Sequence, residues 1–299
     1  VDQLLVPFGE IADLGVKKMK LGFVGLGTMG RPMALNLLKK GADLAVYVRK
    51  PQNFRDFAEK GAVVVTDISA LTVVDIIFLC LPNSDVVKAV LFGDDGLGAE
   101  LRPGQIIVDF STSKYKDTLE IAKRLAEQQV SFLDAPISGM AARAAEGTLT
   151  VMCGGESSAF EIVKPFFACV GNKILYMGGT GTGQMTKLIN QLLFDINVAA
   201  LAELLPLAVK TGLDPKDVGQ VVNSGTGRSY ASEFFVPRIL ENNFSEGYSL
   251  KNAYKDLVSA AELSAEMCVP LPVLHAATTT YQMALLEGQA YGLPIVSYT

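Results

Sequence analysis

The chain has 299 residues, of which 49% are hydrophobic and 19% are charged, and its formal net charge is -5. This length allows two domains that each bury a core, and the apolar fraction excludes extensive disorder. The acidic balance and the lack of any Lys/Arg run exclude a nucleic-acid backbone as the partner.

The cysteine and histidine content excludes the common zinc sites. Cys80, Cys153, Cys169 and Cys268 lie far apart among apolar neighbours without a CxxC pair, and His275 is the single histidine. Ligands for an ordinary zinc site cannot gather from this set, so we expect no metal site. We expect the cysteines to be buried thiols of a protein in a reducing compartment, which indicates the cytoplasm.

The first residues, 1–18, mix acidic, basic and apolar side chains without the order of a signal peptide. We interpret them as an extension of unknown role before the more natural opening Met19-Lys20. No continuous apolar run reaches the ~18 residues of a spanning helix, so we expect no membrane partner.

From Lys20 onward, short β-branched runs alternate with helical stretches, which is typical of a parallel sheet with helical crossovers. The predicted strands are KLGFVG, LAVYV, AVVV, DIIFLCL, QIIVDF, VSFLDAP, LTVMCGG and KILYM, and the predicted helices between them include residues 29–40, 53–60, 114–128 and 157–169. After Tyr176 the strand patterns stop, and helical patterns cover residues 184–211, 214–223, 231–241, 250–268 and 271–288. The sequence predicts an α/β chain: a Rossmann-type, doubly wound domain over 19–180, then an all-α domain over 181–299.

A glycine pattern, Gly25-Leu26-Gly27-Thr28-Met29-Gly30, directly follows the first predicted strand and opens a helix. This context gives a GxGxxG pattern its meaning, because each glycine serves the tight turn, the approach of a pyrophosphate or the packing of helix on strand. The anion then lies on backbone N–H groups at a helix start. We expect residues 25–29 to bind a dinucleotide; a glycine-rich turn without a ligand is the alternative.

The second predicted strand ends in Tyr47-Val48-Arg49-Lys50. This is the position at which dinucleotide-binding domains contact the adenine ribose, and it has no Asp or Glu. A carboxylate there would repel a 2′-phosphate, whereas Arg49 and Lys50 can bind one. NADP(H) is therefore the preferred cofactor and NAD(H) stays open. Ordinary solvated loop charges would give the same sequence.

Two further segments follow predicted strands at the edge where a doubly wound sheet exposes its ligand crevice. They are Leu81-Pro82-Asn83 and Ser111-Thr112. Leu81, Pro82 and Thr112 are predicted cofactor contacts. Plain turns with Asn83 and Ser111 as helix caps would give the same pattern.

Four motifs, GFVGLGTMGRPMALNLLKKG, DAPISG, GTGQMTKLINQ and KDL, occur in an order and spacing that resembles the 3-hydroxyisobutyrate dehydrogenase, or β-hydroxyacid dehydrogenase, family over residues 19–288. The resemblance implies a dinucleotide domain, a helical domain, and reversible hydride transfer at the CH–OH carbon of a short hydroxyacid, in a homodimer or homotetramer. It implies Lys187 as the catalytic residue, Ser138 and Gly139 as ligands of the substrate carboxylate, and Lys255 of KDL at the cofactor. Without it, Lys255 would be an exposed helix charge.

The residues around Lys187 agree with this role. Lys187, Asn190 and Gln191 stand at i, i+3 and i+4 of a predicted helix, so their side chains share one face and can bind one substrate. A lysine ammonium can stabilise the developing oxyanion and donate a proton. In the oxidation direction a neutral Lys187 would be the base, which requires a site that lowers its pKa from ~10.4. A solvated helix lysine is the alternative.

Departures from the family pattern leave the substrate open. Met140 stands where the family carries a second glycine, which narrows one side of the pocket, and Ser138 could instead cap a helix. Asn190-Gln191 is similar to tartronate semialdehyde reductases, whereas residues 224–229 resemble hydroxyisobutyrate enzymes, and residues 288–299 lack the family's usual tail. We expect a small carboxylate-bearing aldehyde or hydroxyacid of the 3-hydroxyisobutyrate, tartronate semialdehyde, glyoxylate or succinic semialdehyde class. A non-catalytic nucleotide-binding scaffold and an imine reductase are the alternatives, and a lysine at position 187 argues against both.

Overall fold

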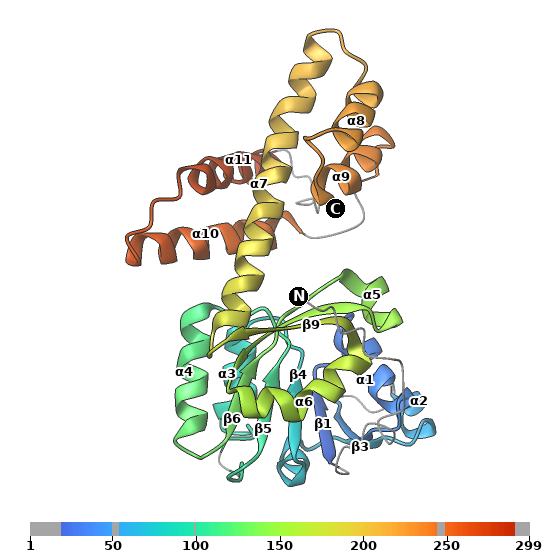
Figure 1. Ribbon diagram of the computed structural model, residues 1–299, viewed down its shortest axis with the longest axis vertical. Helices are drawn as coiled ribbons and strands as arrows, with labels where there is room; N and C mark the ends of the chain where they lie inside the picture. Colours follow the sequence, from blue (N-terminus) through green and yellow to red (C-terminus); the bar gives the residue numbers. More distant parts are fainter. Residues whose placement is uncertain (1–18, 50–53, 99, 244–248, 291–299) are drawn as a thin grey trace. The chain divides into compact units, whose positions relative to one another are not determined.

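The computed structural model describes residues 19–49, 54–98, 100–243 and 249–290 (Figure 1). The extension 1–18, Lys50 and the tail 291–299 lie outside the described residues. The chain divides into two compact units, one through Lys187 and one from Leu188 onward. The boundary expected from the sequence lies between residues 180 and 181.

Among the described residues of the first unit, nine strands form one sheet. They are β1 (Lys20–Val24), β2 (Asp43–Tyr47), β3 (Val63–Val65), β4 (Ile76–Leu79), β5 (Ile106–Asp109), β6 (Ser131–Asp134), β7 (Ile137–Ser138), β8 (Leu149–Gly155) and β9 (Gly171–Gly178). The order is β3-β2-β1-β4-β5-β6-β8-β7, and β9 pairs with β8. Strands β1 to β6 are parallel, with the chain reversing its direction of growth between β1 and β4, so the doubly wound prediction is confirmed.

The strands beyond β6 differ from the all-parallel sheet that the sequence predicts. Strand β8 pairs antiparallel with β6 and with β7, and β9 then runs parallel to β8. The short strand β7 was not predicted, because two residues carry no alternation that distinguishes a strand from a turn. The antiparallel direction was missed because an apolar run does not reveal which way its neighbour runs.

Helices cover both faces of the sheet (Figure 1). Those of the first unit are α1 (Gly30–Lys39), α2 (Arg55–Glu59), the 3-10 helix η3 (Ile68–Val73), α3 (Ser84–Phe92), α4 (Tyr115–Ala126), α5 (Met140–Glu146) and α6 (Ser157–Val170). Alternate strand residues enter two separate cores: Phe23 and Phe78 pack with α1 and α6, whereas Val24 and Leu79 pack with α3 and α4. Helices α1 and α6 therefore cover one face, and α3 and α4 cover the other.

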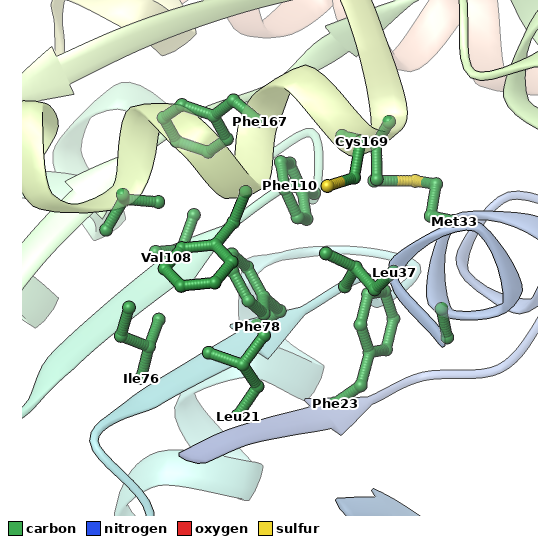
Figure 2. Packing of buried hydrophobic residues seen from close by; sticks show 14 of the residues in the cluster. Leu21, Phe23, Met33, Leu37, Ile76, Phe78, Val108, Phe110, Phe167 and Cys169 are labelled. Atoms are coloured by element: carbon green, nitrogen blue, oxygen red, sulfur yellow. The ribbon is translucent and has the colours of Figure 1, made fainter. Parts of the chain in front are cut away.

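The first of these cores is rich in aromatic rings (Figure 2). The Phe78 and Phe110 rings stack with centroids 5.5 Å apart, and Phe110 meets Phe167 of α6 edge-on at 5.8 Å. Burial of such rings contributes on the order of 2–3 kcal/mol for each side chain. This packing fixes the strands whose ends carry the predicted site.

In the second unit, every regular element among the described residues from Leu188 onward is a helix, as the sequence predicts. Its elements are the long helix α7 (Thr182–Lys210), which begins in the first unit, and α8 (Pro215–Ser224), α9 (Tyr230–Leu240), α10 (Leu250–Glu266) and α11 (Pro272–Ala290). Its core includes the buried side chains of Phe235, Leu257, Leu274 and Tyr281.

Helix α7 is unusually apolar for its exposure. Among the described residues it has the length and composition of a membrane-crossing helix, with a mean hydropathy of 1.9 and 17% of its most apolar window buried. Length and composition alone are weak support for a membrane span, because helices of soluble proteins also meet these criteria. Asp195, which is fully buried, and Glu203, which accepts a hydrogen bond from Thr280 at 2.7 Å, are costly in a bilayer.

The cysteines only partly follow the expectation of burial. Cys153 and Cys169 are buried and Cys80 is half-buried, but Cys268 is exposed, so that part of the prediction is wrong. Cys268 follows the last turn of α10 with a φ of 53°, in a loop whose apolar sequence neighbours are themselves exposed. Burial raises the pKa of the Cys169 thiol to about 11, which keeps it protonated and unreactive.

Candidate active site

The glycine loop between β1 and α1 has the close contacts that its pattern predicts. Gly25 has a φ of +99°, and a Cβ on it would lie 2.2 Å from the Cys80 carbonyl oxygen. A Cβ on Gly30 would lie 1.9 Å from the Gly25 carbonyl oxygen. Glycine is therefore required at both positions to fold the turn and to seat α1 on the sheet.

Gly27 differs, because the fold itself does not require a glycine there. It is exposed, and a Cβ on it would meet no atom within 4 Å. The N-cap residue of α1, Met29, makes no side-chain hydrogen bond to the first turn, and that turn carries no acidic residue. This open cradle at a helix N-terminus fits a pyrophosphate. Leu26 and Met29 beside it are half-buried, and Thr28 is exposed.

Arg49 lies two residues beyond the end of β2 and is exposed. Since Tyr47 pairs in register with Val24, the residue before the glycine loop, β2 ends at the same edge of the sheet as that loop. Lys50, the second predicted phosphate ligand, lies outside the described residues.

The turns after β4 and β5 separate the two interpretations that the sequence left open. Asn83 is the N-cap of α3 and accepts a hydrogen bond from the Val86 N–H at 3.0 Å, as the capping interpretation predicts. Ser111 caps no helix, so that alternative is wrong for it: its hydroxyl accepts the Leu81 N–H at 2.9 Å, and the N-cap of α4 is Lys114. The pattern missed this because a hydroxyl can bind an N–H of a neighbouring strand end as well as one of its own turn.

The predicted cofactor contacts in these turns have different exposures. Leu81 is half-buried, and Pro82 and Thr112 are exposed. Because Leu79 and Asp109 pair in register, both turns leave the sheet at the edge that carries the glycine loop.

A buried polar cluster that sequence reasoning missed lies at this same edge. Asp109 accepts the Ser111 N–H and the Ser113 hydroxyl, both at 2.9 Å. Asp134, paired in register with Asp109, accepts the N–H of Gly181 at 2.7 Å and that of Gln184 at 2.9 Å. One signal in the sequence could have indicated this cluster: β5 and β6 are mainly apolar, and each ends in an aspartate.

Burial dominates the acid–base behaviour of these two carboxyls. Loss of solvation raises the pKa of Asp109 to about 6, although the hydrogen bonds from Ser111 and Ser113 lower it. Loss of solvation likewise raises the pKa of Asp134 to about 6, against the hydrogen bonds from the Gly181 and Gln184 backbone. Hydrogen-bond donors therefore stabilise the charged form of each carboxyl, whereas the loss of hydration destabilises it.

The predicted substrate loop follows β6. Ser138 belongs to β7 and pairs with Thr150, and the N-cap of α5 is Gly139, so the alternative in which Ser138 caps this helix is wrong. Gly139 has a φ of +141° and Met140 a φ of +61°, which is uncommon for a residue with a side chain. Met140 is 43% exposed. A glycine would adopt its backbone conformation without strain.

Lys187 lies near the start of α7, one turn after Gln184, and is half-buried. Asn190 is exposed, and Gln191 is half-buried and donates a hydrogen bond to the Asp195 carboxylate at 3.3 Å. The helix confirms the shared spacing of the three predicted residues. Lys187 closes the first unit, whereas Asn190 and Gln191 belong to the second.

Lys255 lies on α10 in the second unit, and its side chain is 45% exposed. Its ammonium lies 3.3 Å from the carboxylate of the buried Asp256.

The first unit gathers the glycine loop, Arg49 and the β4 and β5 turns at one sheet edge. Across the described residues, no group of three or more His, Cys, Asp or Glu side chains could hold a metal ion.

Comparison with known proteins identifies both units. Residues 20–178 match the NAD binding domain of 6-phosphogluconate dehydrogenase, and residues 181–292 match the NAD-binding region of NADP-dependent 3-hydroxyisobutyrate dehydrogenase. The 2-(hydroxymethyl)glutarate dehydrogenase of Eubacterium barkeri is 37% identical over 279 residues, which cover 93% of this chain and 91% of that protein. The 2-hydroxy-3-oxopropionate reductase of Escherichia coli K12 is 38% identical over 255 residues, covering 85% and 87%.

A solved structure has the same fold. The 3-hydroxyisobutyrate dehydrogenase of Mycobacterium tuberculosis, determined with L-serine, superposes with a TM-score of 0.82 at 28% identity, covering 94% of this chain and 97% of that one. The glycine cradle, the two-unit fold and these matches agree. The chain belongs to the 3-hydroxyisobutyrate dehydrogenase, or β-hydroxyacid dehydrogenase, family of NAD(P)-dependent CH–OH oxidoreductases.

Proposed function

We propose that this protein interconverts a short β-hydroxyacid and its semialdehyde with NADP(H), and that Lys187 is the general acid and base. The substrate belongs to the 3-hydroxyisobutyrate, tartronate semialdehyde, glyoxylate or succinic semialdehyde class. One observation carries the proposal: Lys187 stands one turn into a helix whose first residues bond to the ends of β5 and β6, at the edge that holds the glycine loop.

The chemistry asked of Lys187 is a proton transfer to one oxygen atom. A bound nicotinamide cofactor supplies or accepts the hydride at the substrate carbon. During reduction of the semialdehyde, the Lys187 ammonium stabilises the charge that develops on the carbonyl oxygen and then donates a proton to it. During oxidation the neutral amine removes the hydroxyl proton.

Substrate recognition in this proposal uses small polar groups. The Ser138 hydroxyl and the Gly139 backbone hold the substrate carboxylate, and the Asn190 and Gln191 amides bind the oxygens near the reacting carbon. Met140, exposed in its strained backbone conformation at the start of α5, presents an apolar surface two residues after Ser138. This favours a substrate with an apolar or small group over one with a second charged arm.

The preference for NADP(H) depends on the end of β2. Arg49 is exposed at the glycine-loop edge, and residues 47–49 carry no carboxylate that would repel a 2′-phosphate. An arginine can donate two parallel hydrogen bonds to a phosphate. Lys50 adds a second positive charge in the sequence, and Lys255 is assigned to the nicotinamide side.

The protein is further proposed to be a homodimer or homotetramer. Helix α7 exposes an apolar stripe, and its large members Ile189, Leu193, Leu204 and Leu207 are each more than half exposed. At 3.6 residues per turn these four residues lie within about 60° of one another, on the side of α7 opposite Lys187 and Gln191. A second copy that covers this stripe would leave Lys187 and Gln191 accessible, whereas Asn190 lies beside the stripe.

A substrate panel tests the proposed activity. Wild-type protein is mixed with NADPH or NADH and with short semialdehydes, glyoxylate and cyclic imines, and coenzyme oxidation is followed by absorbance. We expect turnover of at least one semialdehyde or glyoxylate, with higher kcat/KM for NADPH than for NADH. Turnover of imines alone would instead indicate an imine reductase, and no turnover at all would indicate a nucleotide-binding scaffold.

A further inference from the structure

Five buried polar residues cluster at the sheet edge, and the proposed function gives none of them a role in binding the cofactor or the substrate. Asp109 and Asp134 are fully buried, Ser111 and Gln184 are 3% exposed, and Ser113 is 8% exposed. Burial of so many polar groups is costly unless each is hydrogen-bonded. The structure satisfies them with one another and with backbone groups, which indicates a specific purpose for the cluster.

Asp134 caps helix α7 from a distant part of the chain. Its two carboxylate oxygens accept the Gly181 N–H at 2.7 Å and the Gln184 N–H at 2.9 Å, across 47 and 50 residues. The helix start lies so close to the strands that a Cβ on Gly183 would lie 2.4 Å from the carbonyl oxygens of both Asp134 and Met152. The first turn of α7 is therefore bonded to the end of β6 and packed closely against the middle of β8.

Gln184 makes a second attachment through its side chain. Its amide oxygen accepts the Ser113 N–H at 3.0 Å, and its amide nitrogen donates to the Ser111 carbonyl at 2.7 Å. Asp109 in turn holds this turn through Ser111 and Ser113, and the Ser111 hydroxyl accepts the Leu81 N–H. A continuous hydrogen-bond network thus joins the ends of β4, β5 and β6 to α7.

Lys187 follows Gln184 by three residues, so the two side chains lie on one face of α7, one above the other. A helix rises about 1.5 Å per residue and closes a turn about every 3.6 residues, so fixing Gln184 also fixes the position of the Lys187 Cα, which lies one turn away. Proton transfer depends steeply on such placement, because a misplacement of about 1 Å can cost on the order of 100-fold in rate.

We propose that Asp134 and Gln184 are positioning residues, which hold Lys187 at the sheet edge in the geometry that proton transfer needs. This inference rests on the proposed function, since it assigns Lys187 the proton-transfer role. It requires that the hydrogen bonds of Gln184, and not only its volume, support turnover.

The test compares two buried glutamines of the same unit. Gln105, 4% exposed, donates to the Thr72 carbonyl at 3.0 Å and to the Val74 carbonyl, and lies at the opposite end of β5 from the site. Gln184→Met and Gln105→Met keep a similar side-chain volume and remove the hydrogen bonds. If either variant fails to fold, Gln184→Leu and Gln105→Leu take their place, since leucine also removes the hydrogen bonds and adds no charge to a buried site.

We expect Gln184→Met to lower kcat on the order of 10- to 100-fold, with the substrate KM and the NADPH dissociation constant changed less than threefold. Gln105→Met should lose thermal stability to a similar extent and keep the wild-type kcat. The two substitutions are then repeated in Lys187→Ala and measured by single-turnover coenzyme oxidation. Because Gln184 acts through Lys187, Gln184→Met should cause no further loss there.

Three results would overturn the positioning role: a wild-type kcat in Gln184→Met, an equal loss in Gln105→Met, or the same fold loss with and without Lys187. The last would indicate a structural role alone. These outcomes are distinct from failure of the proposed function. If Lys187→Ala turns over like wild type, the proton-transfer assignment itself is wrong; if Lys187→Ala is impaired but Gln184→Met is not, only the positioning inference is wrong.

Discussion

Among the residues that the structure describes, Arg49 is the one on which the proposed preference for NADP(H) rests. It is exposed two residues after β2, at the edge that carries Gly27, and residues 47–49 include no acidic side chain. A charge-assisted hydrogen bond to a phosphate contributes about 1.5–3 kcal/mol. One side chain can therefore change the coenzyme preference by an order of magnitude or more.

Replacement of this arginine by an acid should reverse the preference. In Arg49→Asp, we expect kcat/KM for NADPH to fall on the order of 10- to 100-fold, because the carboxylate repels the 2′-phosphate and can bind the ribose hydroxyls of NADH. Steady-state kinetics with both coenzymes measures this. The matched control is Lys173→Asp. Lys173 is an exposed cation of β9, which pairs with β8 and is separated from β2 by several strands. Unchanged NADPH kinetics in Arg49→Asp would exclude Arg49 as a phosphate ligand.

Single residues were predictable where a local motif demands them. The glycines at 25 and 30 follow from a strand-turn-helix pattern, and the structure requires both. Gln184 was treated only as a helix start, because its side-chain partners are 71 and 73 residues away in the chain. The alternative in which Ser111 caps a helix was wrong for the same reason, since its partner Leu81 is 30 residues distant. Local patterns do not encode such contacts.

At the scale of elements, short β-branched runs identified the longer strands, and apolar residues at helical spacing identified the helices of both units. The two-residue strand β7 and the antiparallel pairing of β8 could not be predicted, since strand direction depends on how the connection folds. The hydrogen bonds that join strand ends to α7 depend on that arrangement. The candidate site was therefore predictable as a set of motifs, but its supporting network was not.

The end of β5 makes stability depend on pH. Burial raises the pKa of Asp109 to about 6 from an ordinary value of 3.8, so the folded chain binds this proton more tightly than the unfolded chain. Unfolding then releases a proton between these two values. The contribution of Asp109 to the free energy of unfolding therefore falls as pH rises from about 4 to 6, and it stays reduced above this range.

Asp109→Asn should remove this dependence. The amide can accept the Ser111 N–H and donate to the Ser113 hydroxyl, so both contacts can be kept. We expect the free energy of unfolding of the variant, relative to wild type, to increase by about 1–3 kcal/mol between pH 4 and pH 7. Urea unfolding at several pH values measures it, with the exposed Asp43→Asn as control. A difference that stays constant with pH would contradict this account of Asp109.

At the scale of the whole molecule, the exposed stripe on α7 is the main unexplained surface. Apolar patches of this kind on soluble proteins usually mark an interface. We expect the wild-type protein to have the mass of a dimer or tetramer in solution. A double substitution, Leu204→Glu with Leu207→Glu, should reduce that mass, because it puts charges on the stripe.

Light scattering on a size-exclusion column measures both masses. The control is Val221→Glu on α8, which is 69% exposed and lies outside the stripe, and it should keep the wild-type mass. A monomeric wild-type protein would contradict the proposed assembly. Recovery of the wild-type protein in the membrane fraction would instead support α7 as a membrane-spanning helix.

The central claim is that the amine of Lys187 exchanges a proton with the substrate oxygen. Its most direct test is single-turnover oxidation of bound NADPH by the best substrate of the panel, compared between wild type and Lys187→Ala. We predict an unchanged NADPH dissociation constant and a rate lower on the order of 100- to 10,000-fold, partly restored by a small primary amine. An undiminished rate in Lys187→Ala would contradict the account.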